Sequence, residues 1–284
     1  MAVQLRRALR ETLEGWQTDV DPLWRDVVRD VDLAFDDVDP ALQLEPWEPI
    51  FPSRRGRTFP GAPAGAHMLR AFDRLAPAAV RCVILGQDPY PCPAFATGRG
   101  FEAGNVARWR ELDKMFSPSV RAVIQLIVAA RTGEVHHARS FSRWPATLAA
   151  IEEGTIDLEA PGALADRWVA SGVLLLNTSL TLSRFQREGD PHQVRGHLPL
   201  WRPLMVRVLD HLAGRRTPVV FIGFGDAAAE TLAAAGLSGP DAGDTERVIV
   251  RLHPAAADEI LALENPFTLC NRRLQAMGAS AVNW

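Results

Sequence analysis

The sequence contains little cysteine, no excess of basic residues and no long apolar run. Three cysteines in 284 residues are too few for a disulfide framework or a four-thiolate cluster, and none of their spacings is that of a CxxC metal site. With 31 Lys and Arg against 34 Asp and Glu, the net charge of −3 excludes a general polycationic field, so nucleic-acid contact requires a local basic patch. No apolar run approaches the roughly 18 residues of a membrane span, and the N-terminus lacks a continuous apolar signal segment. These absences predict a soluble protein of a reducing compartment, the cytoplasm.

Four short apolar segments predict the strands of a parallel sheet: Val80–Leu85, Gly172–Leu176, Pro218–Ile222 and Arg247–Leu252. Each is rich in β-branched residues or leucine and is bounded by Gly, Asn or His-Pro, which is typical of strands buried on both faces. Helix-like stretches alternate with them, at Ser119–Arg131, Ala163–Ala170, Leu200–Ala213 and Ala227–Ala235. This alternation indicates βαβ crossovers. We therefore expect an α/β fold with a central four-stranded parallel sheet flanked by helices on both faces.

The remaining segments predict helices before the sheet and loops around it. Helices are expected at Val3–Gln17 and Pro22–Phe35, within an N-terminal segment of about residues 1–45 that packs on the sheet domain. Pro46–Gly65 and Gly133–Gly162 have the composition of loops. Because no linker divides the chain, residues 1–284 are expected to form a single domain.

Polar side chains and glycines follow the predicted strands directly. The four ends read Gly86-Gln87-Asp88-Pro89-Tyr90, Asn177-Thr178-Ser179, Gly223-Phe224-Gly225 and His253-Pro254. Ligands of open parallel sheets bind outside the carboxyl ends of the strands, so these side chains are expected to surround one cleft. No phosphate-binding glycine loop and no GxSxG serine elbow follows a strand. Taken one at a time, Asp88 could simply form a turn, Asn177 could cap a turn or helix, and His253 could be an ordinary residue at a strand end. Their occurrence together at the ends of three strands favours a ligand-binding site.

The same residues carry a family resemblance. Gly86–Pro91 (GQDPYP), with Gly98–Phe101 (GRGF), resembles the water-activating motif of family 1 uracil-DNA glycosylases. Leu174–Thr181 (LLLNTSLT) is similar to that family's uracil-reading strand, and His253-Pro254 to the start of its leucine-intercalation loop. Ser117-Pro118-Ser119 and Gly223-Phe224-Gly225 resemble its Pro/Ser-rich and Gly-Ser loops. The resemblance extends over most of the chain, from about residue 20 onward.

The resemblance implies hydrolysis of the bond between uracil and deoxyribose in DNA, as in base-excision repair. Asp88 would position the attacking water and stabilise the cationic sugar, and a neutral His253 would donate to uracil O2. Asn177 would read the base, Tyr90 would exclude the thymine methyl group, Phe101 would stack on the base, and Gln87 would help to hold it. The implied enzyme is a monomer that uses no metal or organic cofactor and has uracil-containing DNA as its partner.

Two segments depart from the family pattern. Pro91 and Cys92 stand where histidine and glycine are usual, which puts the rate in doubt. After His253-Pro254, the phosphate-binding serine is replaced by Ala255 and the intercalating leucine by Ala257, which is too small to separate bases. Opening of a duplex must then come from elsewhere, or single strands are preferred. A protein inhibitor that mimics DNA and captures the leucine should bind weakly.

The loop after Asn177 is the candidate for a substitute wedge, at Phe185–His197, although a solvated insertion explains it equally well. We expect DNA contacts from this loop and from the family-like loops, at Arg184, Arg187, Arg195, Ser117, Ser119, Gly223, Gly225, Pro254, Ala255 and Ala257. Arg54–Arg57 is either a solvated face or a further phosphate contact. His136 and His137 could bind zinc together with His192 or His197, but the sequence favours the interpretation that they are ordinary surface histidines. A glycosylase for another deaminated base, or a DNA binder without turnover, remains an alternative.

Overall fold

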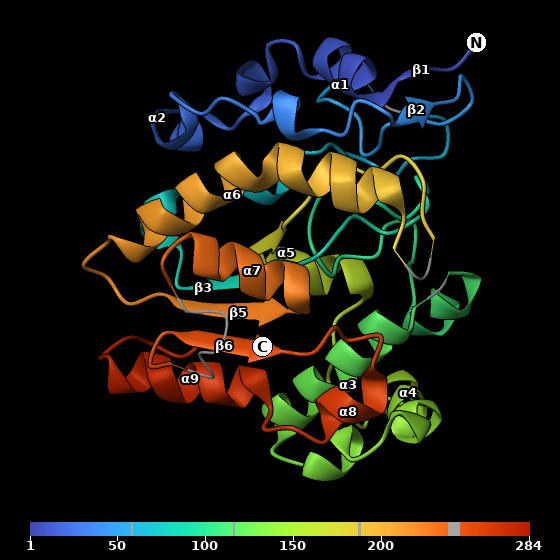
Figure 1. The fold of residues 1–284 in the computed structure, drawn as a ribbon. Helices are drawn as coiled ribbons and strands as arrows, with labels where there is room; N and C mark the ends of the chain where they lie inside the picture. The colour runs from blue at the N-terminus through green and yellow to red at the C-terminus, as the bar shows by residue number, and fades with distance from the viewer. Residues whose placement is uncertain (58, 116, 187–188, 238–244) are drawn as a thin grey trace.

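The central sheet has four parallel strands. The computed structural model describes residues 1–284 except 58, 116, 187–188 and 238–244. The strands are β3 (Cys82–Gly86), β4 (Val173–Asn177), β5 (Val220–Phe224) and β6 (Val248–Arg251), in the order β4-β3-β5-β6 (Figure 1). Every residue of β3, β4 and β5 is buried, as expected for strands covered on both faces. The predicted α/β architecture is confirmed.

The strand register brings the carboxyl ends of all four strands to the same edge. Gly86 at the end of β3 pairs with Asn177 at the end of β4, and Phe224 at the end of β5 pairs with Arg251 at the end of β6. The loops that follow therefore start side by side. This edge positions the predicted site.

Helices cover the sheet close to the predicted bounds. They are α3 (Pro118–Thr132), α5 (Pro161–Ala170), α6 (Leu198–Ala213), α7 (Asp226–Ala234) and α9 (Pro266–Ala276). Proline lies in the first turn of α3, α5, α6 and α9, where its missing N–H costs no helical hydrogen bond. Helices α7 and α9 contact β5, and α5 contacts β4. No helix among the described residues is long and apolar enough to cross a membrane.

The predicted helix over residues 22–35 is wrong beyond its first turns. Asp21 caps a 3₁₀ turn at Pro22–Trp24, which continues only into the short helix α2 (Arg25–Val28). Farther on, buried Val31 and Leu33 alternate with exposed neighbours, which is the burial period of extended chain. Helix α1 (Leu5–Leu13) forms within its predicted range, between the paired strands β1 (Val3–Gln4) and β2 (Gln43–Leu44).

The segment predicted as a loop at 133–162 contains helix α4 (Trp144–Glu152) and 3₁₀ turns at Val135–Ala138 and Phe141–Arg143. Pro145 lies in the first turn of α4, where proline is compatible with a helix. The short helix α8 (Ala257–Leu261), after β6, was also not predicted.

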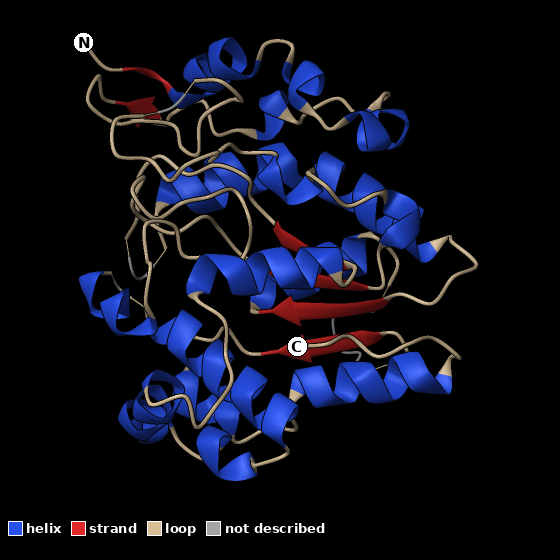
Figure 2. Cartoon of the chain, turned by 180° about the vertical axis from the view of Figure 1, so that it is seen from behind, coloured by secondary structure: helices blue, strands red, loops and turns tan. Residues whose placement is uncertain are grey.

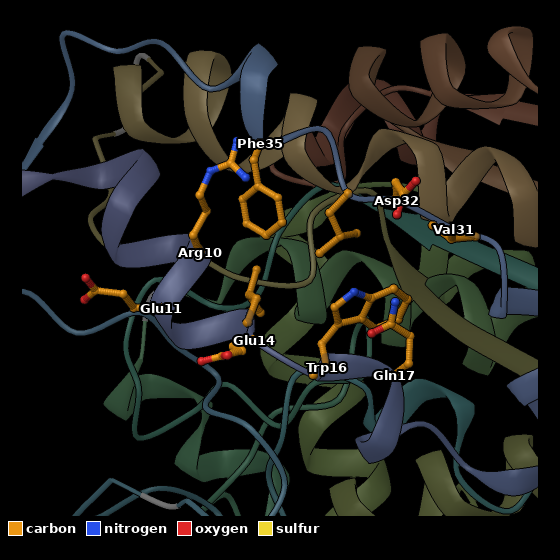
Figure 3. A pocket seen from close by; sticks show the side chains of 11 residues that line it. Arg10, Glu11, Glu14, Trp16, Gln17, Val31, Asp32 and Phe35 are labelled. Atoms are coloured by element: carbon orange, nitrogen blue, oxygen red, sulfur yellow. The ribbon is translucent and has the colours of Figure 1, made fainter.

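The N-terminal segment packs on the outer side of α6, away from the sheet (Figures 1 and 2). The Arg207 guanidinium on α6 donates to the Val27 carbonyl at 3.0 Å, and the rings of Trp16 and Trp201 lie edge to face at 6.3 Å. Leu9 and Trp24 belong to the same apolar core as the strands. A cavity of about 610 Å³ lies between α1 and residues 31–35 (Figure 3) and contains none of the predicted site residues.

Candidate active site

A cavity of about 340 Å³ lies at the carboxyl ends of the strands. Its lining includes all six side chains that were predicted for catalysis and base recognition: Gln87, Asp88, Tyr90, Phe101, Asn177 and His253. They come from the end of β4 and from the loops after β3 and β6, so the fold gathers residues that are up to 166 positions apart (87 to 253). The cavity is large enough for a nucleobase-sized ligand.

The loop after β3 is fixed to the loop after β4 by backbone hydrogen bonds. The Gln87 carbonyl accepts from the Ser179 N–H at 2.9 Å and from the Thr178 hydroxyl at 2.8 Å. The Gly86 carbonyl accepts from the Thr178 N–H at 2.9 Å. These bonds continue the parallel ladder beyond the strands, and they hold Gln87 and Asp88 in place beside Asn177.

Two glycines leave room for the Asn177 side chain. A Cβ atom on Gly86 would lie 2.7 Å from Asn177 Oδ1, and one on Gly100 would lie 3.1 Å from the same oxygen. Asn177 is only 5% exposed, and no described residue forms a hydrogen bond with its side-chain amide. Its donor and its acceptor are therefore both free for a bound ligand.

One oxygen of the Asp88 carboxyl group, Oδ1, is fully buried and has no hydrogen-bond partner among the described residues. Burial raises the pKa of Asp88 to about 8, because the charged form loses water there, although the Gln87 side chain interacts with the carboxyl group and partly offsets the effect of burial. Buried polar atoms without a partner are rare in folded proteins and cluster at functional positions. Asp88 is thus available to accept a hydrogen bond, and then a proton, from a water molecule in the cavity.

Tyr90 and Phe101 form rigid aromatic walls of the cavity. The Tyr90 hydroxyl is buried without a partner among the described residues, and burial, followed by the charge of Glu102, raises the pKa of Tyr90. Phe101 adopts φ +61°, a left-handed conformation that is rare for a bulky residue. Its ring packs edge to face against Phe224 at 5.2 Å. The strained backbone of Phe101 therefore holds an aromatic face at the cavity wall.

A hydrogen bond within its own loop and the protein around it determine which form of the His253 ring is present. The Ala255 N–H donates to His253 Nδ1 at 3.2 Å, so Nδ1 acts as the acceptor. The surrounding protein displaces water from the imidazole and lowers the pKa of His253, which favours the neutral ring. A neutral ring with Nδ1 as acceptor carries its proton on Nε2. His253 therefore offers a neutral N–H donor, and Gly225, at φ +86°, allows the backbone to lie against it.

The residues expected to contact DNA fall into two groups. Ser119 and Ala255 line the cavity, and Gly225 lies beside His253. Ser117 is buried instead, with its hydroxyl donating to the Leu112 carbonyl at 2.8 Å. Gly223 and Pro254 are buried as well, and a Cβ atom on Gly223 would lie 2.7 Å from the Leu232 side chain. Gly223 therefore serves the packing of α7 on β5.

Ala257 and the arginines of the long loop lie differently from their prediction. Ala257 is the first residue of α8 and is only 8% exposed, so it presents almost no surface. Arg184 is paired with Glu48 at 3.0 Å, and Arg195 with Asp39 at 2.5 Å. These partners are more than 130 residues away in sequence, which is why the loop alone suggested free cations. Arg187 lies outside the described residues.

The basic run and the histidines also have internal partners. Arg54 binds Asp19 at 2.6 Å and is largely shielded from solvent, whereas Arg55 binds Asp73 at 2.5 Å and stays exposed, as expected of a solvated face. His192 and His197 both contact the buried hydroxyl of Ser183, at 2.9 and 3.0 Å. Burial lowers the pKa of His197 to about 3. This buried cluster does not include His136 or His137.

The lining also includes Arg99, to which the sequence assigned no role, and Phe185, Gln186 and Gln193, which the sequence named only as members of the candidate wedge loop. Arg99 is buried and pairs with Asp166 at 2.8 Å. The other three belong to the long loop after β4, which therefore reaches the cavity mouth. Their signal in the sequence was the length of that loop.

The curated relatives of this chain carry one name, uracil-DNA glycosylase. No protein-family model matches the chain. The chain is 31% identical over 236 residues to a uracil-DNA glycosylase of Parafrankia sp., which covers 81% of this chain and 82% of the relative. Uracil-DNA glycosylase 1 of Streptomyces avermitilis gives the same identity and the same coverage.

Solved structures share the fold. The wild-type UNG of Nitratifractor salsuginis superposes with a TM-score of 0.59 at 23% identity, covering 97% of this chain and 98% of that one. The uracil-DNA glycosylase of mimivirus also gives a TM-score of 0.59, at 15% identity, covering 100% and 94%. With the curated relatives at about 30% identity over most of their length, these likenesses make the chain a member of the uracil-DNA glycosylase family.

Proposed function

We propose that this protein releases uracil from DNA by hydrolysing its N-glycosidic bond and leaves an abasic site. The observation that carries the proposal is the cavity, in which a carboxyl group with one buried, unpaired oxygen lies beside a neutral imidazole and a free carboxamide. A base must leave the duplex stack to reach such a cavity. The reaction then needs a positioned water molecule and donors for the departing base.

Asp88 acts on the water and the sugar. Its unpaired oxygen accepts a hydrogen bond from the water, orients it toward the anomeric carbon and takes its proton as the C–O bond forms. Its negative charge also stabilises the positive charge that develops on the sugar as the bond to the base breaks. Gln87, fixed through its carbonyl, helps to hold the base beside Asp88.

His253 and Asn177 act on the base. The uracil departs as an anion, and the Nε2–H group of neutral His253 donates to its O2 atom as the charge develops. The Asn177 amide donates to one uracil group and accepts from another, a pattern that cytosine mismatches. Phe101 stacks on the ring, and Tyr90 occupies the space of a thymine methyl group.

We further propose that residues 1–284 act as a single monomeric domain in the cytoplasm, on single- or double-stranded DNA. Ser119, Gly225 and Ala255 supply contacts to the DNA backbone at the cavity. Because no leucine stands at Ala257, a protein inhibitor that captures such a leucine binds weakly.

Matched oligonucleotides test the function directly. Each carries one uracil, as a single strand or opposite guanine or adenine, and alkali converts abasic sites to strand breaks. We expect breaks in all three substrates and none in controls that carry thymine or cytosine. A uracil-specific gel shift without strand breaks would show instead that the protein binds uracil-containing DNA without cleaving it.

Phe185 is the candidate for the missing wedge. It lines the cavity and is 43% exposed, so it lies where the cavity opens to solvent. Apolar side chains of this size insert between base steps in DNA-bending proteins. We propose that Phe185 fills the gap left by the flipped base, a step that single strands do not need.

Phe185→Ala is therefore expected to lower kcat/KM on duplex DNA by about tenfold or more and to leave single-strand cleavage nearly unchanged. The ratio of the two rates, measured at one salt concentration, gives the result. Val194→Ala is the matched control, because Val194 is an exposed apolar residue of the same loop outside the cavity lining. Equal losses on both substrates would contradict a wedge.

A further inference from the structure

Two histidines and a glutamate gather at a distance from the cavity lining, at the end of α3. Gly133 ends α3, and Glu134, His136 and His137 follow in the next turn. Glu134 Oε2 lies 3.6 Å from His136 Nδ1 and 3.5 Å from His137 Nε2. The three ligand atoms all lie within 4.8 Å of one another. The sequence showed the two histidines but not that Glu134 completes a cluster with them.

Two of the three spacings in this cluster, those from the Glu134 carboxylate, match the ligand spacing of a zinc site. Zinc binds imidazole nitrogen and carboxylate oxygen at about 2.1 Å, so two ligands of a tetrahedral ion lie about 3.4 Å apart. The two distances from Glu134 Oε2 are within a few tenths of an ångström of this value. Two imidazoles and one carboxylate are also a common donor set for zinc, with the fourth position left to water.

Buried neighbours hold His137 in the orientation that a ligand needs. Its Nδ1 lies 3.2 Å from the hydroxyl of Thr147, which is fully buried, so Nε2 is the nitrogen turned toward Glu134. Its carbonyl accepts from Gln125 Nε2 at 2.7 Å. Metal-binding histidines are typically fixed through their other ring nitrogen in this way.

We propose that Glu134, His136 and His137 form a binding site for a zinc ion, outside the cavity that releases uracil. Its role is structural, because the same segment is tied to the loop of His253. The Ser140 hydroxyl and the Phe141 N–H donate to the Asp258 carboxylate at 3.0 and 2.8 Å. Asp258 lies in α8, which starts four residues after His253. A bound ion fixes the turn that holds this helix.

Calorimetric titration of the full chain with zinc chloride tests the site, after dialysis against a chelator. We expect one saturable site per chain and a higher Tm with zinc. His136→Ala and Glu134→Gln change exposed residues and should each weaken binding at least tenfold, and Thr147→Val should weaken it less. His211→Ala, on α6, is the control and should bind zinc as the unchanged chain does.

Cobalt gives an independent readout. Co²⁺ in the site should show the intense visible bands of a tetrahedral ion, and His136→Ala should abolish them. Absence of saturable binding, or binding that survives both His136→Ala and Glu134→Gln, would overturn the proposal. None of these measurements depends on uracil release, so failure of the zinc site and failure of the proposed function are separable.

Discussion

Asp88→Asn is expected to slow uracil release by about 10²–10⁴-fold while binding of uracil-containing DNA changes little. The substitution keeps the shape of the side chain but removes the negative charge that stabilises the sugar and the basic oxygen that takes the proton from the water. Single-turnover cleavage gives the chemical step, and fluorescence anisotropy with the same oligonucleotide gives Kd. Equal losses in both would make Asp88 a structural residue.

The pH dependence of the free enzyme follows from the same group. Burial raises the pKa of Asp88 to about 8, and the reaction needs the carboxylate, so kcat/KM should rise with pH up to about 8 and then level off. The residual activity of Asp88→Asn should lack this rise. A profile that is flat between pH 6 and 9 in the unchanged enzyme would contradict the role of Asp88 as a base.

Stability provides a control that does not depend on activity. The pKa of Asp88 is higher in the folded chain than its ordinary value of 3.8, so folding favours the protonated form. The stability that this preference contributes is present below pH 4 and is lost as pH rises to about 8. Asp88→Asn stays neutral, so its Tm should exceed that of the unchanged protein at pH 9 and approach it at pH 4.

His253→Ala is expected to lower the rate of the chemical step by about 10²–10³-fold, the typical cost of removing one donor to a developing anion. The hydrogen bond from the Ala255 N–H places the proton of the ring on Nε2, which makes His253 a neutral donor. Single-turnover cleavage at saturating enzyme measures this loss. A substrate whose leaving group departs more easily than uracil should lose less.

The direction in which activity changes with pH distinguishes a neutral His253 donor from a protonated one. The surrounding protein lowers the pKa of His253, so the ring is neutral throughout the range in which Asp88 ionises. A neutral donor requires no protonation, and activity should persist above pH 8. If the imidazolium were the donor, activity would fall as pH rises through the histidine pKa, and this outcome would reject the neutral form.

The sheet and the residues at its carboxyl edge could be predicted because their signals are local. Each buried strand is a short apolar run, and parallel strands necessarily bring their carboxyl ends together. Asp88, Asn177 and His253 each stand within a few residues of such an end, so knowledge of the strands was enough to place them in one cavity. Resemblance supplied their roles.

Other features depend on contacts that no local pattern records. Arg184 and Arg195 are paired with Glu48 and Asp39, acids that only the folded chain brings close. The turn at Glu134 differs from these pairs, because its carboxylate and two histidines are neighbours in sequence and only the 3₁₀ turn after α3, in a segment predicted as a loop, brings them together. The chain around Val31 is extended rather than helical, and the Ala34 N–H donates to the Leu200 carbonyl of α6 at 3.2 Å, a contact that the local sequence does not reveal.

The two ion pairs of the long loop have a consequence for how this enzyme can be shortened. Glu48 and Asp39 hold the two ends of the loop that carries Phe185 and Gln193 to the cavity mouth. The first fifty residues contain none of the proposed catalytic side chains, but through these two ion pairs they hold the long loop in place at the cavity mouth. A protein shortened to the sheet and its helices would keep Asp88 and His253. Its long loop would no longer be held in place at the mouth of the cavity, where the base enters.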